Sequence, residues 1–335
     1  MAVKVGINGF GRIGRLVFRA LCERKESALT VAAINDLGPA ETNAHLLRHD
    51  STHGAFPGTV KAGPDFIDAG AGPVKILAER DPEKLPWKDL GVELVLECTG
   101  LFTKRADAEK HLKAGAKRVL ISAPATGADL TVVYGVNNQL LSPDHKIVSN
   151  ASCTTNCLAP VAHVIHREIG LERGYMTTVH AFTGDQQIVD TLHKDLRRAR
   201  AAAHSMIPTS SGAAKALGLV LPDLDGKLHG CAIRVPVLNV SLIDLVFQAP
   251  RETSVEEING ALTKAAQGSL KGILAVSDEP LVSADYNHDS ASATVDLLET
   301  QVVDKSLGRV LAWYDNEWGF SNRMADTAAA MAKLK

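Results

Sequence analysis

The first 36 residues place a strand, a glycine-rich turn, a helix and a second strand in direct succession. A β-branched run over residues 3–7 leads through Asn8 into Gly9-Phe10-Gly11-Arg12-Ile13-Gly14. Residues 15–22 then carry apolar side chains at helical spacing, and a second β-branched run over residues 30–36 ends at Asp36. This order predicts a βαβ unit and therefore an open sheet of parallel strands in the first half of the chain.

The glycine-rich turn suits a dinucleotide. Gly9, Gly11 and Gly14 together allow a tight turn, a close approach of the backbone to a pyrophosphate, and close packing of the helix on the strand. The helix N-terminus would hold the phosphates, and Asp36, 22 residues after Gly14, would take the ribose hydroxyls. A plain glycine-rich turn is the alternative, but the flanking strand and helix and the spacing of the acid favour dinucleotide binding.

Further β-branched runs fit strands of the same sheet. They lie at residues 92–97, 118–122, 131–134 and 146–149. Thr99 and Ser122 stand at the carboxyl ends of the first two, where ligands bind in open parallel sheets, so both hydroxyls are candidate cofactor contacts. Capping of a loop is the alternative role for each of them.

A cysteine stands among small hydroxylated residues in Ser152-Cys153-Thr154-Thr155-Asn156-Cys157, directly after the last of these strands. An apolar segment at helical spacing follows, so Cys153 would meet the free N–H groups and the positive dipole end of a helix, which favour thiolate over thiol. Its place after a parallel strand would bring it to the cofactor crevice. Cys153 is therefore a candidate nucleophile. Burial as a small apolar residue is the alternative, and it is the interpretation we prefer for Cys157.

The second half of the chain has longer strands. They are predicted at residues 175–181, 232–238, 240–248 and 309–315, as members of a mostly antiparallel sheet, with a C-terminal helix over residues 317–333. Two prolines interrupt these patterns. Pro160 indicates that the helix after Cys153 either kinks or starts its regular part nearer Asn156. Pro236 indicates an edge strand or a bulge.

His180 closes the strand over residues 175–181, three residues before Thr183. A thiol nucleophile needs a positioned base, and a strand-end histidine can supply one. Arg234 lies within an apolar strand and should have a partner or a ligand, because burial of an unpaired guanidinium is costly. Residues 193–200 and 209–215 also suit oxyanions; for the first of these segments, a solvated charged face is the alternative.

Composition excludes several classes of function. The 335 residues suffice for two domains, and 36 basic against 38 acidic residues give a net charge of −2, which predicts no general attraction to nucleic acid or to an anionic membrane. No apolar run has membrane-spanning length, and no signal peptide is expected before the first strand. Five cysteines without a disulfide framework indicate free thiols in a reducing cytosol, and no metal cluster of credible spacing is present.

Sites for a nucleotide, a thiolate, a base and phosphates together indicate one reaction class. A cysteine thiolate adds to an aldehyde, and a hydride leaves to a nicotinamide. The thioester that remains is then attacked by phosphate, water or another acceptor.

On these residues the chain resembles phosphorylating glyceraldehyde-3-phosphate dehydrogenase from end to end. The segments that carry the resemblance are residues 7–15, 151–160, 193–203, 206–215 and 313–323. The resemblance implies an α/β protein with a Rossmann NAD-binding domain, residues 1–152 with 316–335. It implies an α+β catalytic domain, residues 153–315, with a mostly antiparallel sheet. It also implies a homotetramer that uses glyceraldehyde 3-phosphate, inorganic phosphate and NAD.

The resemblance further implies roles for individual residues. Cys153 matches the nucleophile and His180 the residue that activates it, while Thr183 and Arg234 match the site of the substrate's phosphate. The positions that match binding of the attacking phosphate or neighbouring anions are Ser152, Thr154, Arg198, Ser211 and Gly212. The positions that match cofactor contacts, added to Gly9, Gly11, Gly14 and Thr99 of the motif analysis, are Arg12, Ile13, Asp36, Arg80, Ser122 and, for the nicotinamide amide, Asn316.

One departure from the family pattern concerns the cofactor. Thr191-Leu192 stand where strictly NAD-using members commonly have an apolar residue and a proline, and changes there accompany NADP use in some members. Asp36 argues for NAD, because its carboxylate would repel a 2′-phosphate. We expect NAD, with NADP as a weaker alternative.

Two other functions stay open at this point. The first is an erythrose-4-phosphate dehydrogenase with water as the acyl acceptor, against which the retained hydroxyls of Ser152, Thr154 and Ser211 favour phosphate. The second is a non-catalytic nucleotide-binding protein that uses Cys153 as a redox switch. A sensor of that kind has no use for a strand-end base such as His180.

Overall fold

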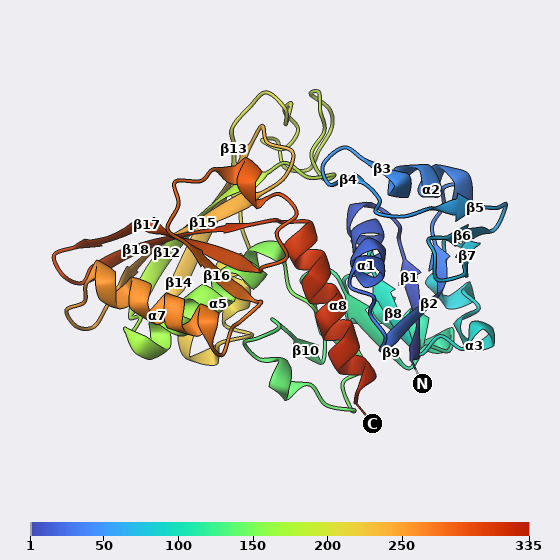
Figure 1. Ribbon diagram of the computed structural model, residues 1–335, viewed down its shortest axis with the longest axis horizontal. Coiled ribbons are helices and arrows are strands. Elements are labelled where there is room, and N and C mark those ends of the chain that lie inside the picture. Colours follow the sequence, from blue (N-terminus) through green and yellow to red (C-terminus); the bar gives the residue numbers. More distant parts are fainter. Residues whose placement is uncertain (1, 335) are drawn as a thin grey trace. The chain divides into compact units, whose positions relative to one another are not determined.

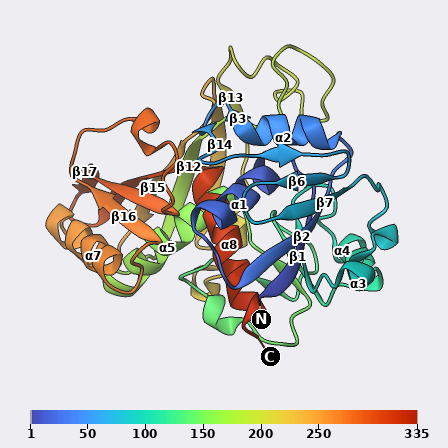
Figure 2. The same ribbon diagram turned by 45° about the vertical axis from the view of Figure 1, so that its right-hand side comes forward.

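The computed structural model describes residues 2–334, which belong to two compact units (Figures 1 and 2). One unit comprises Met1–Ser152 and Ser321–Lys335, and the other comprises Cys153–Phe320. The sequence analysis grouped residues 316–320 with the cofactor domain, whereas the structure packs them with the second unit. Asp315 accounts for part of this, because its Oδ1 accepts hydrogen bonds from the backbone N–H groups of Glu317 and Trp318.

A nine-stranded sheet forms the centre of the first unit, in the order β10-β11-β9-β8-β1-β2-β7-β6-β5. The strands are β1 (Val3–Asn8), β2 (Leu29–Asn35), β5 (Lys61–Ala62), β6 (Phe66–Asp68), β7 (Pro73–Leu77), β8 (Leu94–Glu97), β9 (Arg118–Ile121), β10 (Leu130–Thr131) and β11 (Ile147–Ser149). The strands from β10 to β7 pair in parallel, and β6 pairs antiparallel with both β7 and β5. This confirms the predicted Rossmann class; β5, β6 and β7 were not predicted.

Helices connect and cover these strands. They are α1 (Arg12–Glu23), α2 (Ala40–Arg48), η1 (Pro82–Lys84), α3 (Trp87–Leu90), α4 (Arg105–Lys113) and η2 (Asn138–Leu140), with the small pair β3 (His49–Asp50) and β4 (Gly54–Ala55) after α2. Among them, α1 begins one turn after β1, as predicted, because Gly11 provides the N-cap position without a side chain.

The C-terminal helix α8 (Trp318–Ala332) belongs from Ser321 onward to this first unit. Figure 2 shows it beside α1, and Arg24 at the end of α1 forms an ion pair with Asp326. Near the C-terminal end of α8, Arg118 of β9 donates to the Met331 carbonyl at 2.8 Å. The chain thus returns to its first domain after completing the second.

A seven-stranded sheet forms the second unit, in the order β13-β14-β12-β15-β18-β17-β16. The strands are β12 (Arg173–Ala181), β13 (Ile207–Ser210), β14 (Leu228–Val235), β15 (Ser241–Gln248), β16 (Leu274–Ser277), β17 (Ala293–Val303) and β18 (Leu307–Tyr314). Only the β12–β14 and β16–β17 pairs are parallel, which confirms the mostly antiparallel sheet.

Helices of the second unit pack on one face of this sheet. They are α5 (Cys153–Glu168), α6 (Ala213–Leu217) and α7 (Val255–Gln267), with η3 (Pro222–Leu224) and η4 (Ser283–Tyr286) in connecting segments. Along β15, buried and half-buried residues alternate over all eight positions. The strand therefore turns one face toward the helices and leaves the other partly open.

The structure differs from the expectations at Pro160 and at Pro236. The helix after Cys153 starts at Cys153 itself and continues through Pro160, so a regular start nearer Asn156 was wrong. β14 ends at Val235 and lies between β13 and β12, so Pro236 is neither in an edge strand nor in a bulge. It lies in a turn closed by the Val237 N–H donating to the Val235 carbonyl at 2.8 Å, where no ladder bond is needed.

Within residues 2–334, no helix is both long and apolar enough to cross a membrane.

Candidate active site

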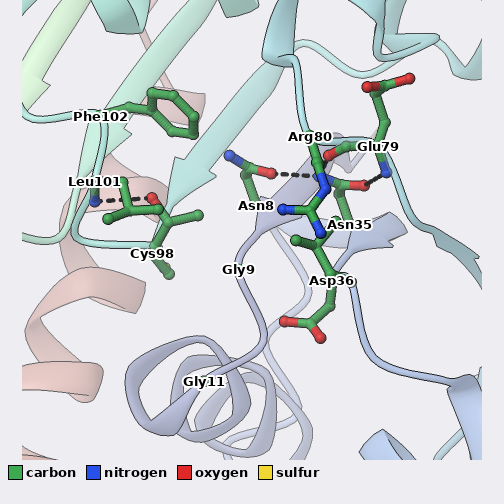
Figure 3. Close-up of a pocket in the computed structure, with 12 residues that line it drawn as sticks. Asn8, Gly9, Gly11, Asn35, Asp36, Glu79, Arg80, Cys98, Leu101 and Phe102 are labelled. Atoms are coloured by element: carbon green, nitrogen blue, oxygen red, sulfur yellow. Dashed lines mark hydrogen bonds between the residues drawn. The ribbon is translucent and has the colours of Figure 1, made fainter. Parts of the chain in front are cut away.

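A cleft of about 380 Å³ opens in the first unit at the carboxyl ends of its central strands (Figure 3). It is lined by residues that end or follow β1, β2, β7 and β8: Asn8, Gly9, Gly11, Asn35, Asp36, Leu37, Glu79, Arg80, Cys98, Thr99, Leu101 and Phe102. Five of the predicted cofactor residues are among them: Gly9, Gly11, Asp36, Arg80 and Thr99. The cleft lies where ligands bind in open parallel sheets.

The space around the three motif glycines shows what a side chain at each position would contact. Gly9 has φ of +88°, and a Cβ there would lie 2.8 Å from the backbone nitrogen of Thr99. A Cβ on Gly14 would lie 2.0 Å from the Gly9 carbonyl oxygen, so only glycine lets α1 approach the turn this closely. A Cβ on Gly11 would meet nothing within 4 Å, which leaves space over the start of α1 for a ligand.

Asp36 is held in place by donors from its own surroundings. Its Oδ2 accepts from the Phe10 N–H at 2.9 Å, and its Oδ1 accepts from the Gly38 N–H at 2.9 Å and from Asn43 Nδ2 at 3.3 Å. A carboxylate with these three bonds has a defined position beside the glycine-rich turn.

The other predicted cofactor residues of the first unit are not among those that line the cleft. Arg12, Ile13 and Gly14 form the first turn of α1, and Ser122 follows β9, where its N–H donates to the Glu97 carbonyl at 2.9 Å. Arg12 pairs with Asp50 through both terminal nitrogens, at 2.6 and 3.2 Å. This guanidinium and the hydrogen bonds to Asp50 lower the pKa of that carboxyl to about 2, against burial, which raises it.

Sequence reasoning missed several residues of the cleft, notably Asn8, Asn35, Glu79, Leu101 and Phe102. A signal existed for the two asparagines, since each is the last residue of a β-branched strand and a polar side chain there faces the ligand side. The other three lie in loops, for which the sequence carried no comparable signal.

In the second unit, Cys153 and His180 face each other. Cys153 is the first residue of α5, and its Sγ lies 3.5 Å from His180 Nε2, near the end of β12. Burial raises the pKa of the Cys153 thiol, while Arg234 and the hydrogen bonds of Thr154 lower it. Burial also lowers the pKa of His180 to about 3, with Arg234 acting in the same direction. At neutral pH the two groups are therefore a thiol beside a neutral imidazole.

The hydrogen bonds of His180 define its tautomer. Its Nδ1 lies 2.6 Å from the Ala181 carbonyl oxygen, which can only accept, and 3.1 Å from Arg234 Nη1, which can only donate. The shorter contact assigns the proton to Nδ1, because an oxygen and a nitrogen lone pair would otherwise face each other at 2.6 Å, and Arg234 Nη1 has Ala181 and Thr183 as acceptors instead. Nε2 is then an acceptor and faces the Cys153 thiol. The edge of the Tyr314 ring packs against the imidazole, with the ring centroids 5.9 Å apart. This is the protonation state that a general base for Cys153 requires.

Arg234 stands opposite His180 in the register of β14 and β12. Its Nη1 donates to the Ala181 carbonyl at 3.0 Å and to Thr183 Oγ1 at 3.4 Å. Its Nε is buried and has no hydrogen-bond partner among the described residues. Arg234 thus has the partner that the sequence predicted, but it keeps a buried donor that an anion could satisfy.

The hydroxyl of Thr154 belongs to a buried hydrogen-bonded chain next to Cys153. Thr154 Oγ1 lies 2.8 Å from the hydroxyl of Tyr314, which lies 3.0 Å from Thr178 Oγ1. Tyr314 was not predicted as a site residue. Its chain fixes the first turn of α5 against β12 and β18, and hence the direction of the Cys153 side chain. Ser152 is half-buried and directly precedes this turn.

The remaining predicted residues of this unit have defined partners. Arg198 Nη1 donates to Asp185 at 2.6 Å, and Arg198 Nε donates to Thr209 Oγ1 at 3.1 Å. Ser211 Oγ accepts from the Ala213 N–H at 3.3 Å, beside Gly212 at the start of the five-residue helix α6. Asn316 Oδ1 accepts from Ser241 Oγ at 2.9 Å, which leaves Nδ2 as the donating end of the amide.

Comparison with known proteins identifies both halves of the chain. Residues 3–105 match the family model described as glyceraldehyde 3-phosphate dehydrogenase, NAD binding domain, and residues 152–316 match the C-terminal domain of the same family. Glyceraldehyde-3-phosphate dehydrogenase of Xanthobacter flavus is 64% identical over 334 residues, with 100% of both chains covered. Those of Cereibacter sphaeroides and Geobacillus stearothermophilus are 60% and 56% identical, with 100% and 99% of both chains covered. The chain therefore belongs to the glyceraldehyde-3-phosphate dehydrogenase family and carries its NAD-binding domain.

Proposed function

We propose that this protein oxidises glyceraldehyde 3-phosphate to 1,3-bisphosphoglycerate with NAD and inorganic phosphate, through a thioester on Cys153. The observation that carries the proposal is the pair of Cys153 Sγ and His180 Nε2, 3.5 Å apart, with the proton of His180 on Nδ1. Full-length relatives that are named glyceraldehyde-3-phosphate dehydrogenase support the proposal.

His180 starts the reaction by taking the thiol proton on Nε2. The thiolate then adds to the aldehyde carbon, and the imidazolium returns the proton to the new alkoxide, which gives a thiohemiacetal. The carbonyl of Ala181, 2.6 Å from Nδ1, stabilises the imidazolium while it lasts. Burial of the His180 side chain keeps the pKa of the imidazole low, so His180 holds the proton only briefly and passes it on.

Oxidation leaves an acyl group on the sulfur. When NAD is bound, its nicotinamide accepts the hydride from the thiohemiacetal carbon. In the same step His180 accepts the hydroxyl proton, so the carbon becomes the carbonyl of a thioester on Cys153. A phosphate oxygen then attacks this carbonyl, the acyl phosphate leaves, and Cys153 recovers its sulfur as a thiolate for protonation by His180.

Arg234 and Thr183 are the proposed site of the substrate's own phosphate. The buried Nε of Arg234 lacks a partner, and its Nη1 already reaches Thr183 Oγ1 at 3.4 Å, so a phosphate here would satisfy the orphaned donor. For the attacking phosphate we propose Arg198, with the hydroxyls and N–H groups of Ser152, Thr154, Ser211 and Gly212.

The cleft of the first unit fits the adenosine half of NAD. Its volume of about 380 Å³ and the open space over Gly11 suit a nucleotide, and Asp36 would accept from the ribose hydroxyls. Three donors hold Asp36 in place, so it has little freedom to move away from a 2′-phosphate. We therefore propose NAD over NADP. Asn316, through Nδ2, is the proposed partner of the nicotinamide amide.

The half-open face of the second sheet supports a homo-oligomer. Val179, Leu242 and Trp313 alternate with buried neighbours on their strands and are themselves only half-buried, as is Ile233 of β14. An apolar sheet face of this extent needs a cover, and a second copy of the chain supplies one. We propose a cytoplasmic homotetramer.

Steady-state kinetics with two substrates test the proposal. The value of kcat/KM is measured for glyceraldehyde 3-phosphate and erythrose 4-phosphate, each with NAD or NADP and with or without phosphate. We expect the highest value for glyceraldehyde 3-phosphate with NAD, and a strict dependence of steady turnover on phosphate. Higher kcat/KM for erythrose 4-phosphate with no phosphate requirement would instead establish the hydrolytic alternative.

A further inference from the structure

Five buried polar or aromatic side chains form a continuous hydrogen-bonded chain beneath the nucleotide cleft. They are Trp87, His111, Glu97, Asn8 and Asn35, and none is more than 5% exposed. We call them the polar chain. Only Asn8 and Asn35 line the cleft; the other three lie behind it.

Chemistry defines the direction of the first two bonds. The indole N–H of Trp87 can only donate, and it lies 3.0 Å from His111 Nδ1, which must therefore be an unprotonated acceptor. The proton of His111 is then on Nε2, which donates to Glu97 Oε2 at 2.9 Å. His111 thus presents a fixed donor to Glu97, and Trp87 maintains that tautomer.

Glu97 is the centre of the polar chain. Its Oε2 also accepts from Asn8 Nδ2 at 2.6 Å, and its Oε1 accepts from the N–H of Thr99 at 2.8 Å and from the Thr99 hydroxyl. A buried carboxylate is costly unless it is fully hydrogen-bonded, and four donors meet that requirement here. Each donor is in turn oriented by the carboxylate.

The chain ends in the walls of the cleft. Asn8 Oδ1 accepts from Asn35 Nδ2 at 2.7 Å, and Asn35 makes two bonds of 2.8 Å with the backbone of Glu79 (Figure 3). Reversal of the Asn8 amide would place its oxygen against the Glu97 carboxylate, so the order of bonds allows only one orientation. Asn8, Asn35, Glu79 and Thr99, all lining residues, thereby take their positions from Glu97.

We infer that Glu97 and His111 are positioning residues for the dinucleotide, although neither lines the cleft. The inference rests on the proposed placement of the adenosine half of NAD. Without the carboxylate, Asn8 and Thr99 can leave their positions, and only a fraction of molecules retains the arranged cleft. Apparent affinity falls by that fraction, whereas turnover at saturating cofactor does not.

The test uses Glu97→Gln and His111→Phe in the full-length protein. In Glu97→Gln, one oxygen becomes an NH₂ group that faces two donors, at nearly constant volume. Calorimetry gives Kd for ADP-ribose and for NAD, steady-state kinetics give kcat at saturating NAD, and thermal unfolding gives Tm. We expect Kd of both ligands to rise roughly tenfold in Glu97→Gln and by a smaller factor in His111→Phe, with kcat unchanged.

Thr327→Val is the matched control. It removes a fully buried hydrogen bond of the same unit, from Thr327 Oγ1 to Asn150 Oδ1 at 2.7 Å, which is not part of the cleft. We expect it to lower Tm and leave both Kd values unchanged. Wild-type Kd values in both test variants would overturn the inference. It would also be overturned if Kd rose in proportion to the loss of Tm in all three variants, the control included. Should Glu97→Gln fail to fold, His111→Phe decides alone.

A fourth variant separates this inference from the placement of the cofactor. Asp36→Ala removes the proposed partner of the ribose hydroxyls. If it weakens ADP-ribose binding while Glu97→Gln and His111→Phe do not, only the positioning role fails. If it leaves the affinity unchanged, the proposed placement fails and the inference fails with it.

Discussion

Replacement of His180 by asparagine should change how the reactivity of Cys153 depends on pH. Burial lowers the pKa of His180 to about 3, so its Nε2 is an available acceptor throughout the neutral range. Because the thiol and imidazole share the same proton from pH 5 to pH 8, the rate of Cys153 alkylation in the wild type should be nearly constant. The asparagine amide can still donate to the Ala181 carbonyl, but its oxygen is too weak a base to take the proton of the thiol, which lies 3.5 Å from Nε2 in the wild type.

In the variant, thiolate forms only by loss of the proton to solvent. A thiol of ordinary pKa, about 8.5, is ~3% ionised at pH 7 and ~0.1% ionised at pH 5.5. Burial raises the pKa of Cys153, so these fractions are upper limits. In the wild type His180 takes the thiol proton as the sulfur reacts, and general-base help of this kind is typically worth about 10²- to 10⁴-fold. Alkylation in His180→Asn should therefore be slower by roughly that factor at pH 7, and by more at pH 5.5, where less thiolate forms by loss of the proton to solvent.

The assay follows the reaction of neutral iodoacetamide with the Cys153 peptide by mass spectrometry, from pH 5 to pH 8. Cys231, a half-buried cysteine in the same unit, gives an internal reference rate in each sample. We expect a flat profile for Cys153 in the wild type and a tenfold rise per pH unit in His180→Asn. Parallel profiles in the two proteins would refute the pairing of Cys153 with His180.

Two further predictions concern the same pair. Cys153→Ser should abolish formation of NADH from glyceraldehyde 3-phosphate while the calorimetric Kd for NAD stays within twofold of wild type; retained turnover would contradict the mechanism. As the pH falls from 6.5, the ordinary pKa of histidine, to about 3, unfolded His180 gains a proton that the folded state excludes, so stability is lost as pH falls. The free energy of unfolding lost in this way is on the order of 5 kcal/mol, and this loss should be missing in His180→Asn. Chemical denaturation measures the free energy of unfolding of both proteins across this pH range, and equal losses in the two would contradict the prediction.

Periodicity predicted much of the first unit. The strand, turn and helix around Gly9 to Gly14 combine a β-branched run, glycines and helical spacing, and three signals that agree leave little choice of local structure. The strands β5 and β6 were not predicted because two or three residues are too few for alternation to stand out, and the five residues of β7 begin with a proline. In the same way, α5 passes Pro160 because packing of a largely buried helix outweighs the loss of one backbone bond.

The candidate site shows the same limit at the level of side chains. Cys153 and His180 were predicted from their places at the ends of elements, and the fold brings them within 3.5 Å. Tyr314 was not predicted, because its role arises from hydrogen bonds to Thr154 and Thr178 that join three separate elements. Glu97 was not predicted for a similar reason. The sequence shows that a carboxylate ends a buried strand, but it does not show which four donors the fold brings to that carboxylate.

The central claim, an acyl group carried by Cys153, is tested most directly by a single turnover without phosphate. Enzyme, NAD and excess glyceraldehyde 3-phosphate are mixed rapidly, and NADH absorbance is followed while the Cys153 peptide is analysed by mass spectrometry. We predict a burst of about one NADH per Cys153, an acyl adduct on that peptide, and steady turnover only after phosphate is added. Continuous NADH formation without phosphate, or a burst with no adduct on Cys153, would contradict this account.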